Sequence, residues 1–158
     1  MLCISLKKPN QMKKILLLTF LFAIISCQKN EYYTKEVLAE KVFKSLQEND
    51  YELFKKSVPS FDLVQKVTDM TASAYDNYVT KAFVESQEEF TKKGFKASDF
   101  ELFKVNEPYR TYEIDSFDYI RYYVIIKNKD NVYLTLDFSD CIKTSEGFKL
   151  GEPIDIKK

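Results

Sequence analysis

The chain has no histidine and no tryptophan, and it has only three cysteines among its 158 residues. Without an imidazole it cannot form a Ser-His-Asp or Cys-His catalytic group, a histidine-ligated zinc site or a histidine general base. Carboxylates, lysines, tyrosines and thiols remain for acid–base or nucleophilic chemistry. No catalytic signature stands out, and the sequence predicts neither a cofactor nor a metal site.

Residues 1–26 have the pattern of a secretory leader. Lys13 and Lys14 precede an apolar run from Ile15 to Ile25, and the small residue Ser26 follows. The run is much shorter than the roughly 20 residues of a membrane-spanning helix. We expect translation to begin at Met12, because the leader then opens Met-Lys-Lys. The alternatives are a buried core helix and an ordinary secretory signal.

The residues around the expected cleavage point add an anchor to this prediction. Ile24-Ile25-Ser26-Cys27 resembles the lipobox of bacterial lipoproteins, and Gln28-Lys29-Asn30-Glu31 resembles the export signal of Bacteroidetes surface lipoproteins. The first resemblance implies that Cys27 is acylated and becomes the mature N-terminus, so that a membrane is a partner through the lipid. Together they imply a bacterial outer-membrane location, either surface-exposed or facing the periplasm.

The rest of the chain has the size of a single domain, residues 33–158, behind a lipidated tether at 27–32. The leader takes four lysines of the 24 basic residues and none of the 24 acidic ones, so the mature chain has an excess of four acidic residues. This charge disfavours nucleic acid as a partner. Cys141 is the only cysteine left in the domain, which excludes a disulfide within it.

The first half of the domain reads as helices. Apolar residues recur every three or four positions from Tyr32 to about Glu48, and Asp50 is a good N-cap for a short second helix that stops at Pro59. Ser60 is expected to cap a third helix. The helical stripe of that segment is Phe61, Val64, Val67 and Met70. A last helix is predicted from about Ser73 to Lys93, with Gly94 as its stop.

Everything after Phe95 reads as strand. The predicted strands are 100–105, 109–114, 119–126, 132–139 and 148–156, with turns at 115–118, 128–131 and 144–147. Pro108 indicates an edge or a bulge, because proline cannot donate to a ladder. The segment 119–126 should be central, because both of its faces are apolar. Helices followed by strands predict an α+β fold, with N-terminal helices packed on a curved antiparallel meander sheet of about four strands.

The order of these elements resembles a known family. The segment from Lys41 to Phe54 resembles the opening helices of nuclear transport factor two-like domains, in the cystatin-like fold group, with Asn49 where glycine is usual. The stretch from Tyr133 to Leu150 resembles their last hairpin. The resemblance implies a curved sheet wrapped on helices around a conical pocket. It carries no catalytic residue over to this chain.

Asp137 is the weak catalytic candidate. It shares a predicted strand face with Tyr133 and Thr135, and a pocket there would make it a general base. The simpler expectation is a solvated face with an exposed Asp137. Tyr123 and Tyr133 are the weak ligand-binding candidates, because aromatic faces stack on glycans or flat apolar ligands. They belong to a larger group of predicted strand tyrosines: Tyr109, Tyr112, Tyr119, Tyr122, Tyr123 and Tyr133.

Two other features have simpler interpretations. Glu113, Asp115 and Asp118 surround one predicted turn, where acidic residues are common, and the ordered spacing of a calcium loop is missing. Cys141 continues a strand alternation and is expected to be a small buried hydrophobe rather than a reactive thiol.

The sequence thus predicts a membrane-anchored lipoprotein that acts as a binding or accessory module outside the cytoplasm. One alternative is a small-molecule lyase or isomerase that uses a carboxylate. The other is a partner-binding inhibitor or immunity-type lipoprotein.

Overall fold

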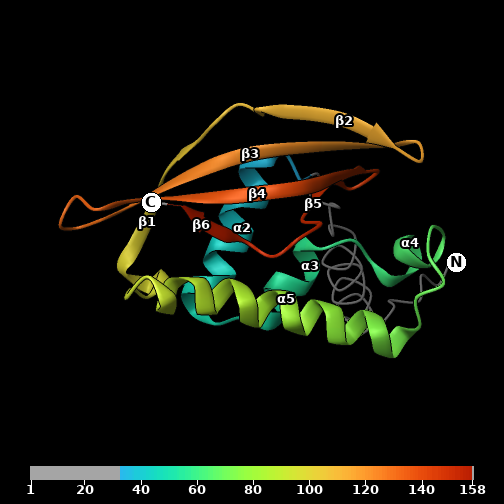
Figure 1. The fold of residues 1–158 in the computed structure, drawn as a ribbon, viewed down its shortest axis with the longest axis horizontal. Helices are drawn as coiled ribbons and strands as arrows, with labels where there is room; N and C mark the ends of the chain where they lie inside the picture. Colours follow the sequence, from blue (N-terminus) through green and yellow to red (C-terminus); the bar gives the residue numbers. More distant parts are fainter. Residues whose placement is uncertain (1–32, 158) are drawn as a thin grey trace, which may run out of the picture. The chain divides into compact units, whose positions relative to one another are not determined.

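The computed structural model describes residues 33–157, and within them the helices precede an antiparallel sheet that curls (Figure 1). Helices α2, α3 and α5 lie on one side of the sheet, and strand β2, which pairs with β3 in the same sheet, lies at an edge far from helix α5. The predicted α+β class is therefore confirmed, with helices packed on a curved sheet.

The helices begin where the sequence supplies caps. The Asp50 carboxylate accepts a hydrogen bond from the Leu53 N–H at 2.9 Å, and the Thr34 hydroxyl does the same for Val37 at 3.3 Å. Asn49, with φ of 54°, ends the first helix in the left-handed region and makes the break before the second. The α-helices are α2 (Lys35–Glu48), α3 (Tyr51–Ser57), α4 (Phe61–Gln65) and α5 (Ala72–Lys92).

The third helix is shorter than its apolar stripe predicted. Ser60 occupies the N-cap position, but its side chain makes no capping hydrogen bond. The N–H groups of Lys66 and Val67 donate to carbonyls three residues back, which tightens the last turn and ends α4 at Gln65. As a result Val67 is exposed rather than packed in the core.

Strand β3 is the centre of the sheet, as its apolar sequence predicted. It pairs with β4, and its other edge is shared by β1 and β2, which are separated by the loop that holds Pro108. After the short 3₁₀ helix η1 (Ala97–Asp99), the strands are β1 (Phe100–Val105), β2 (Arg110–Ile114), β3 (Phe117–Asn128), β4 (Tyr133–Thr144), β5 (Gly147–Lys149) and β6 (Asp155–Lys157).

The turns have the backbone that their residues favour. Asp115 and Ser116 both have positive φ, 50° and 67°, the combination that a two-residue hairpin turn requires between twisted strands. In the next turn the Asn128 side chain accepts hydrogen bonds from the N–H groups of Asp130 and Val132. All three predicted turns are present.

The last strand is interrupted, which the sequence analysis did not predict. The segment 150–154 leaves the sheet opposite Asp140, which has a φ of 51° and marks an irregularity in β4. A Cβ atom on Gly151 would lie 2.1 Å from the Asp140 carbonyl oxygen, so this close approach requires glycine. The single predicted strand at 148–156 is therefore two short strands, β5 and β6, both paired with β4.

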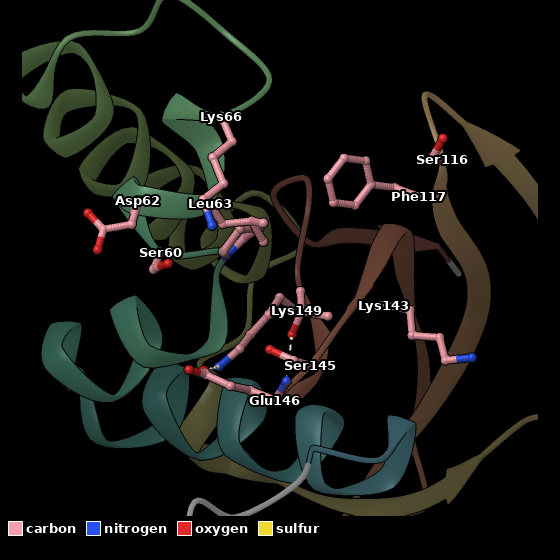
Figure 2. Close-up of a pocket in the computed structure, with 12 residues that line it drawn as sticks. Ser60, Asp62, Leu63, Lys66, Ser116, Phe117, Lys143, Ser145, Glu146 and Lys149 are labelled. Atoms are coloured by element: carbon pink, nitrogen blue, oxygen red, sulfur yellow. Dashed lines mark hydrogen bonds and ion pairs between the residues drawn. The ribbon is translucent and has the colours of Figure 1, made fainter.

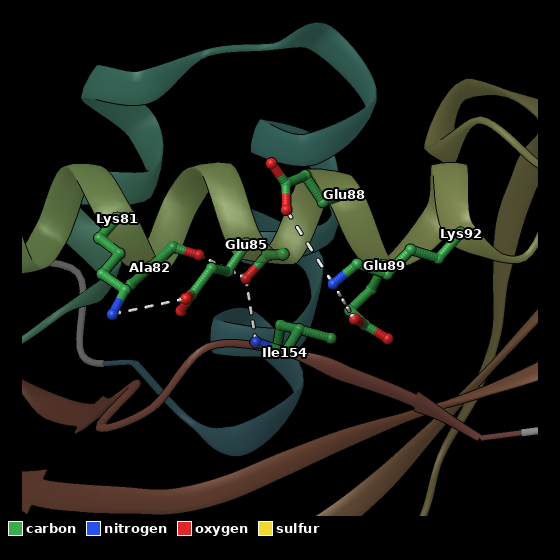
Figure 3. A network of polar contacts seen from close by, with 8 residues as sticks. Lys81, Ala82, Glu85, Glu88, Glu89, Lys92 and Ile154 are labelled. Atoms are coloured by element: carbon green, nitrogen blue, oxygen red, sulfur yellow. Dashed lines mark hydrogen bonds and ion pairs between the residues drawn. The ribbon is translucent and has the colours of Figure 1, made fainter.

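The core lies between the helices and the inner face of the sheet. Its largest fully buried side chains include Tyr122, Phe54, Phe90, Phe138, Leu38 and Ile126. Helix α5 is fastened to the segment before β6 by Ser86, whose hydroxyl donates to the Ala82 carbonyl and accepts from the Ile154 N–H (Figure 3). The exposed side of α5 carries ion pairs, such as Lys81 with Glu85.

The start of the described chain is also fixed to the sheet. Tyr33 forms a parallel bridge with Gly147, through the Tyr33 N–H to the Glu146 carbonyl at 2.8 Å and the Phe148 N–H to the Tyr33 carbonyl at 2.7 Å. Lys41 and Lys149 complete this junction, because the ammonium groups of both lie over the Tyr33 ring.

Candidate functional site

The face of the sheet turned away from the helices, here called the outer face, gathers polar and aromatic side chains. Along β3 the odd-numbered positions from 119 to 127 point to this face, because Ile120, Tyr122, Val124 and Ile126 point into the core. The outer face includes Phe103, Tyr109, Arg110, Tyr112, Tyr119, Arg121, Tyr123, Lys127, Tyr133, Asp137, Asp140 and Lys157.

Asp137 lies in the middle of the outer face, and only 5% of its surface is exposed. The expectation that it is solvated is therefore wrong. Tyr109 lies across it and donates its hydroxyl to Oδ1 at 3.0 Å, while Lys157 on β6 brings Nζ to 2.5 Å from Oδ2. A phenol 28 residues away in sequence and a lysine 20 residues away thus cover the carboxylate.

Tyr123, one of the two predicted ligand-binding tyrosines, belongs to the same cluster. Its ring stacks on the Tyr109 ring with centroids 4.5 Å apart, and Lys157 Nζ lies 5.0 Å from its centroid. Burial and the hydrogen bond to Asp137 raise the pKa of Tyr109 to about 12, and the Asp137 contact raises the pKa of Lys157. Both shifts favour the protonated forms, so at neutral pH Tyr109 is a neutral phenol and Lys157 is an ammonium group.

Tyr133, the other predicted tyrosine, lies elsewhere on the outer face. It is 49% exposed, packs edge-to-face against the exposed Phe103 ring at 5.5 Å, and has Lys127 over its ring. The structure therefore does not bring Tyr133 to Asp137, although both residues are on β4. The two form separate aromatic positions on one surface.

A second polar cluster surrounds Asp140. Arg121 Nε donates to Asp140 Oδ1 at 2.6 Å, and the Tyr112 hydroxyl donates to the same oxygen. The ring of Tyr112 stacks on that of Tyr119 with centroids 5.3 Å apart and planes 6° from parallel. The contact with Arg121 lowers the pKa of Asp140, whereas partial burial and the nearby Asp140 charge raise the pKa of Glu152.

A cleft of about 360 Å³ opens at another place, between α4 and the turns of the β2–β3 and β4–β5 hairpins (Figure 2). Two of the three lysines that line it, Lys143 and Lys149, form contacts with neighbouring residues. Lys149 contacts Glu146 at 3.2 Å and donates to the Lys56 carbonyl at 3.0 Å, and Lys143 lies 3.5 Å from Asp118. Asp137 and the outer-face tyrosines do not line this cleft.

The other residues that the sequence singles out lie in the core or at an exposed turn. Cys141 is fully buried in the core, as predicted, and burial raises the pKa of its thiol far above the ordinary value. Glu113, Asp115 and Asp118 lie at the exposed β2–β3 turn. Within residues 33–157, no group of three or more acidic or cysteine side chains is placed to hold a metal ion.

The anchor prediction falls outside the described residues, since Cys27 precedes them. In the part of the chain that the structure describes, no helix combines the length and apolar character that a membrane span needs. Comparisons with protein-family models, with curated proteins and with solved structures find no match. The function must therefore be inferred from the chain's own residues.

Sequence reasoning found Asp137 and Tyr123 but missed what surrounds them. The strand pattern gives Tyr109 only as one strand tyrosine among several, and it gives no indication of Lys157 or Arg121. The composition does single out Arg121, because only two of the 24 basic residues of the chain are arginines and it is one of them. No local pattern links Lys157 to Asp137, because β6 reaches β4 only after the interruption at 150–154.

Proposed function

We propose that this chain is a lipid-anchored binding module outside the cytoplasm, and that it takes a saccharide on the outer face of its sheet. The leader and Cys27 support the location. The observation that carries the binding role is the exposure of aromatic rings on the outer face: Phe103 is 56% exposed, Tyr133 49% and Tyr109 47%. Neighbouring exposed apolar side chains on one face often mark an interaction site.

The arrangement of the rings favours a saccharide as the occupant. A sugar ring has an apolar face of C–H groups and a rim of hydroxyls, so it requires an aromatic platform beside polar partners. Tyr109 offers such a platform directly above the Asp137–Lys157 pair. Tyr119 and Tyr112 offer a second one beside Asp140 and Arg121.

The alternative function is a lyase or isomerase that uses Asp137. The observation that favours it is the burial of this carboxylate beside a phenol. However, Tyr109 and Lys157 already occupy both carboxylate oxygens, and Lys157 neutralises the charge. The contacts of Asp137 therefore favour a structural role, in which this residue links β4 to β6 and to the loop before β2.

The proposal is tested by affinity electrophoresis of the full chain, in a non-ionic detergent, through gels that contain neutral or acidic polysaccharides. We expect retardation by at least one polysaccharide, and about tenfold weaker binding for Tyr109→Ala and Tyr133→Ala. Val84→Ala is the matched control, because Val84 is an exposed apolar residue on α5. Retardation by none of the polysaccharides, or equal losses in the control, would contradict the proposal.

The same preparations distinguish the enzyme. Turnover of a small-molecule substrate that disappears in Asp137→Asn, with the fold kept, would replace the binding module by the lyase or isomerase. Specific binding of another protein at Tyr109 and Tyr133, without saccharide binding, would favour the inhibitor or immunity-type alternative.

A further inference from the structure

The two arginines of the chain lie directly opposite each other. All other basic residues are lysines, yet the register of β2 and β3 pairs Arg110 with Arg121. Both guanidinium groups lie against the ring of Tyr112, with carbon Cζ at 5.0 Å from its centroid for Arg110 and 5.6 Å for Arg121. The three side chains form one unit on the outer face.

This pairing is unfavourable by itself. Like charges directly opposite on neighbouring strands repel each other, and the nearby carboxylates, Asp140 and Glu152, interact with Arg121 and not with Arg110. Within residues 33–157, the Arg110 side chain makes no hydrogen bond or ion pair, and its guanidinium contacts the Tyr112 ring. Glu113 on β2 and Asp118 on β3 are the nearest acidic residues along these two strands, but the strand alternation places their side chains on the opposite face of the sheet.

The residue type also points to a specific ligand chemistry. A guanidinium is a planar fork that binds carboxylate, sulfate or phosphate through two parallel hydrogen bonds, which an ammonium cannot do. Arg121 is held in place by Asp140 through Nε, which leaves its terminal nitrogens as further donors. Arg110 is exposed at the start of an edge strand and has its fork available.

We propose that Arg110 and Arg121, with the stacked rings of Tyr112 and Tyr119, form a subsite for the acidic group of a saccharide, a carboxylate or a sulfate. The inference rests on the proposed saccharide binding and names the class of sugar. The arginine pair supplies the charge, and the tyrosine platform supports the ring that carries the acid.

The test measures the affinity of the full chain, in a non-ionic detergent, for three probes by isothermal titration calorimetry. They are an oligomer of galacturonic acid, its neutral methyl ester, and a sulfated galactan oligomer. We expect an acidic probe, carboxylated or sulfated, to bind at least about tenfold more tightly than the ester, with an affinity that falls as salt rises. The acidic probe with the higher affinity identifies the source of the charge.

Arg110→Gln should abolish this preference, because the affinity for the acidic probe should fall to about that for the ester. Arg110→Lys should restore little of it, because the fork is lost while the charge is kept. Lys81→Gln is the charge-matched control, since Lys81 lies on the exposed side of α5. Thermal unfolding should be nearly unchanged in Arg110→Gln, because Arg110 is exposed. Arg121→Gln tests the partner arginine on β3 in the same way, and it should also reduce the preference for the acidic probe.

Equal binding of the acidic and neutral probes by the wild-type chain would overturn the acidic subsite and leave saccharide binding in place, provided that Tyr109→Ala weakens both. Full preference for the acid in Arg110→Gln or Arg110→Lys would overturn the arginine assignment. Binding of none of the three probes would overturn the subsite. Saccharide binding itself is then judged by the wider polysaccharide panel and its tyrosine variants.

Discussion

The Ser86 hydroxyl accepts a hydrogen bond of 2.9 Å from the backbone N–H of Ile154, and both residues are buried. This contact joins the middle of α5 to the segment between β5 and β6, 68 residues further along the chain. Ser86 therefore satisfies an N–H group that leaves the sheet where the last strand is interrupted.

Ser86→Ala should lower the free energy of unfolding by about 1–3 kcal/mol, because the Ile154 N–H would stay buried without an acceptor. Denaturant unfolding followed by circular dichroism measures the change. Thr91→Ala, an exposed position on the same helix, should change it by less than about 0.5 kcal/mol. Equal effects of the two substitutions would show that the Ser86 contact is unimportant.

Asp137→Asn should also destabilise the domain, by about 1–3 kcal/mol, because it removes the charge from two hydrogen bonds in a buried position. Tyr109→Phe removes only one of these bonds and should cost less. A double-mutant cycle between the two changes measures their coupling, which should be clearly different from zero. Additive effects would mean that Tyr109 and Asp137 do not act as one cluster.

The raised pKa of Tyr109 predicts a loss of stability in alkali. In the unfolded chain a tyrosine has a pKa near 10, whereas Tyr109 in the folded domain has a pKa of about 12. The folded state therefore holds this proton more tightly, and the contribution is present below pH 10 and is lost as the pH rises through 12. Tyr109→Phe should flatten the fall in stability across this interval.

Unfolding curves of the two proteins at a series of alkaline pH values provide the measurement. Other tyrosines with raised pKa values, such as Tyr119 and Tyr122, are present in both proteins, so the difference between the curves isolates Tyr109. Parallel curves would contradict the prediction.

Gly147→Ala should break the bridge to Tyr33. Gly147 has a φ of 104°, and a Cβ atom there would lie 2.3 Å from the Tyr33 nitrogen, so the two backbones would have to separate. We expect a loss of about 2 kcal/mol or more in the free energy of unfolding. Gly94→Ala is the control, because Gly94 also has a positive φ but an added Cβ atom would meet open space. A comparable loss of stability in Gly94→Ala would mean that backbone strain alone, and not the contact with Tyr33, explains the effect.

Cys27→Ser tests the anchor. We expect the wild-type chain to incorporate labelled fatty acid and to sediment with membranes, and the variant to lose both properties. Cys141→Ser is the control for labelling, because Cys141 is buried in the domain core. A variant that stays labelled and membrane-bound would exclude lipidation at Cys27.

Local signals were sufficient for most of the fold. The Asp50 cap, the stop at Gly94 and the alternation along β4 each depend on neighbours a few residues apart, and all three are present in the structure. The length of α4 was overestimated, because a helical stripe does not reveal where 3₁₀-type hydrogen bonds end a helix.

The site depended on distant residues. Whether Asp137 is solvated is decided by Tyr109, which precedes it by 28 residues and reaches it only after two strands have paired. The opposition of Arg110 and Arg121 depends on the register of one hairpin, which the positive φ values at Asp115 and Ser116 fix. The strand pattern therefore predicted the face of the sheet, but not the partners on it.

The bridge between Tyr33 and Gly147 has a mechanical consequence. If the chain is tethered at its N-terminal side, any pull on the tether enters the domain at Tyr33 and is first resisted by its two backbone hydrogen bonds. These bonds transfer the load to the β4–β5 hairpin, which is paired with the sheet. Helix α2, which begins two residues after Tyr33, is thereby shielded from a force that would otherwise unwind it from its first turn.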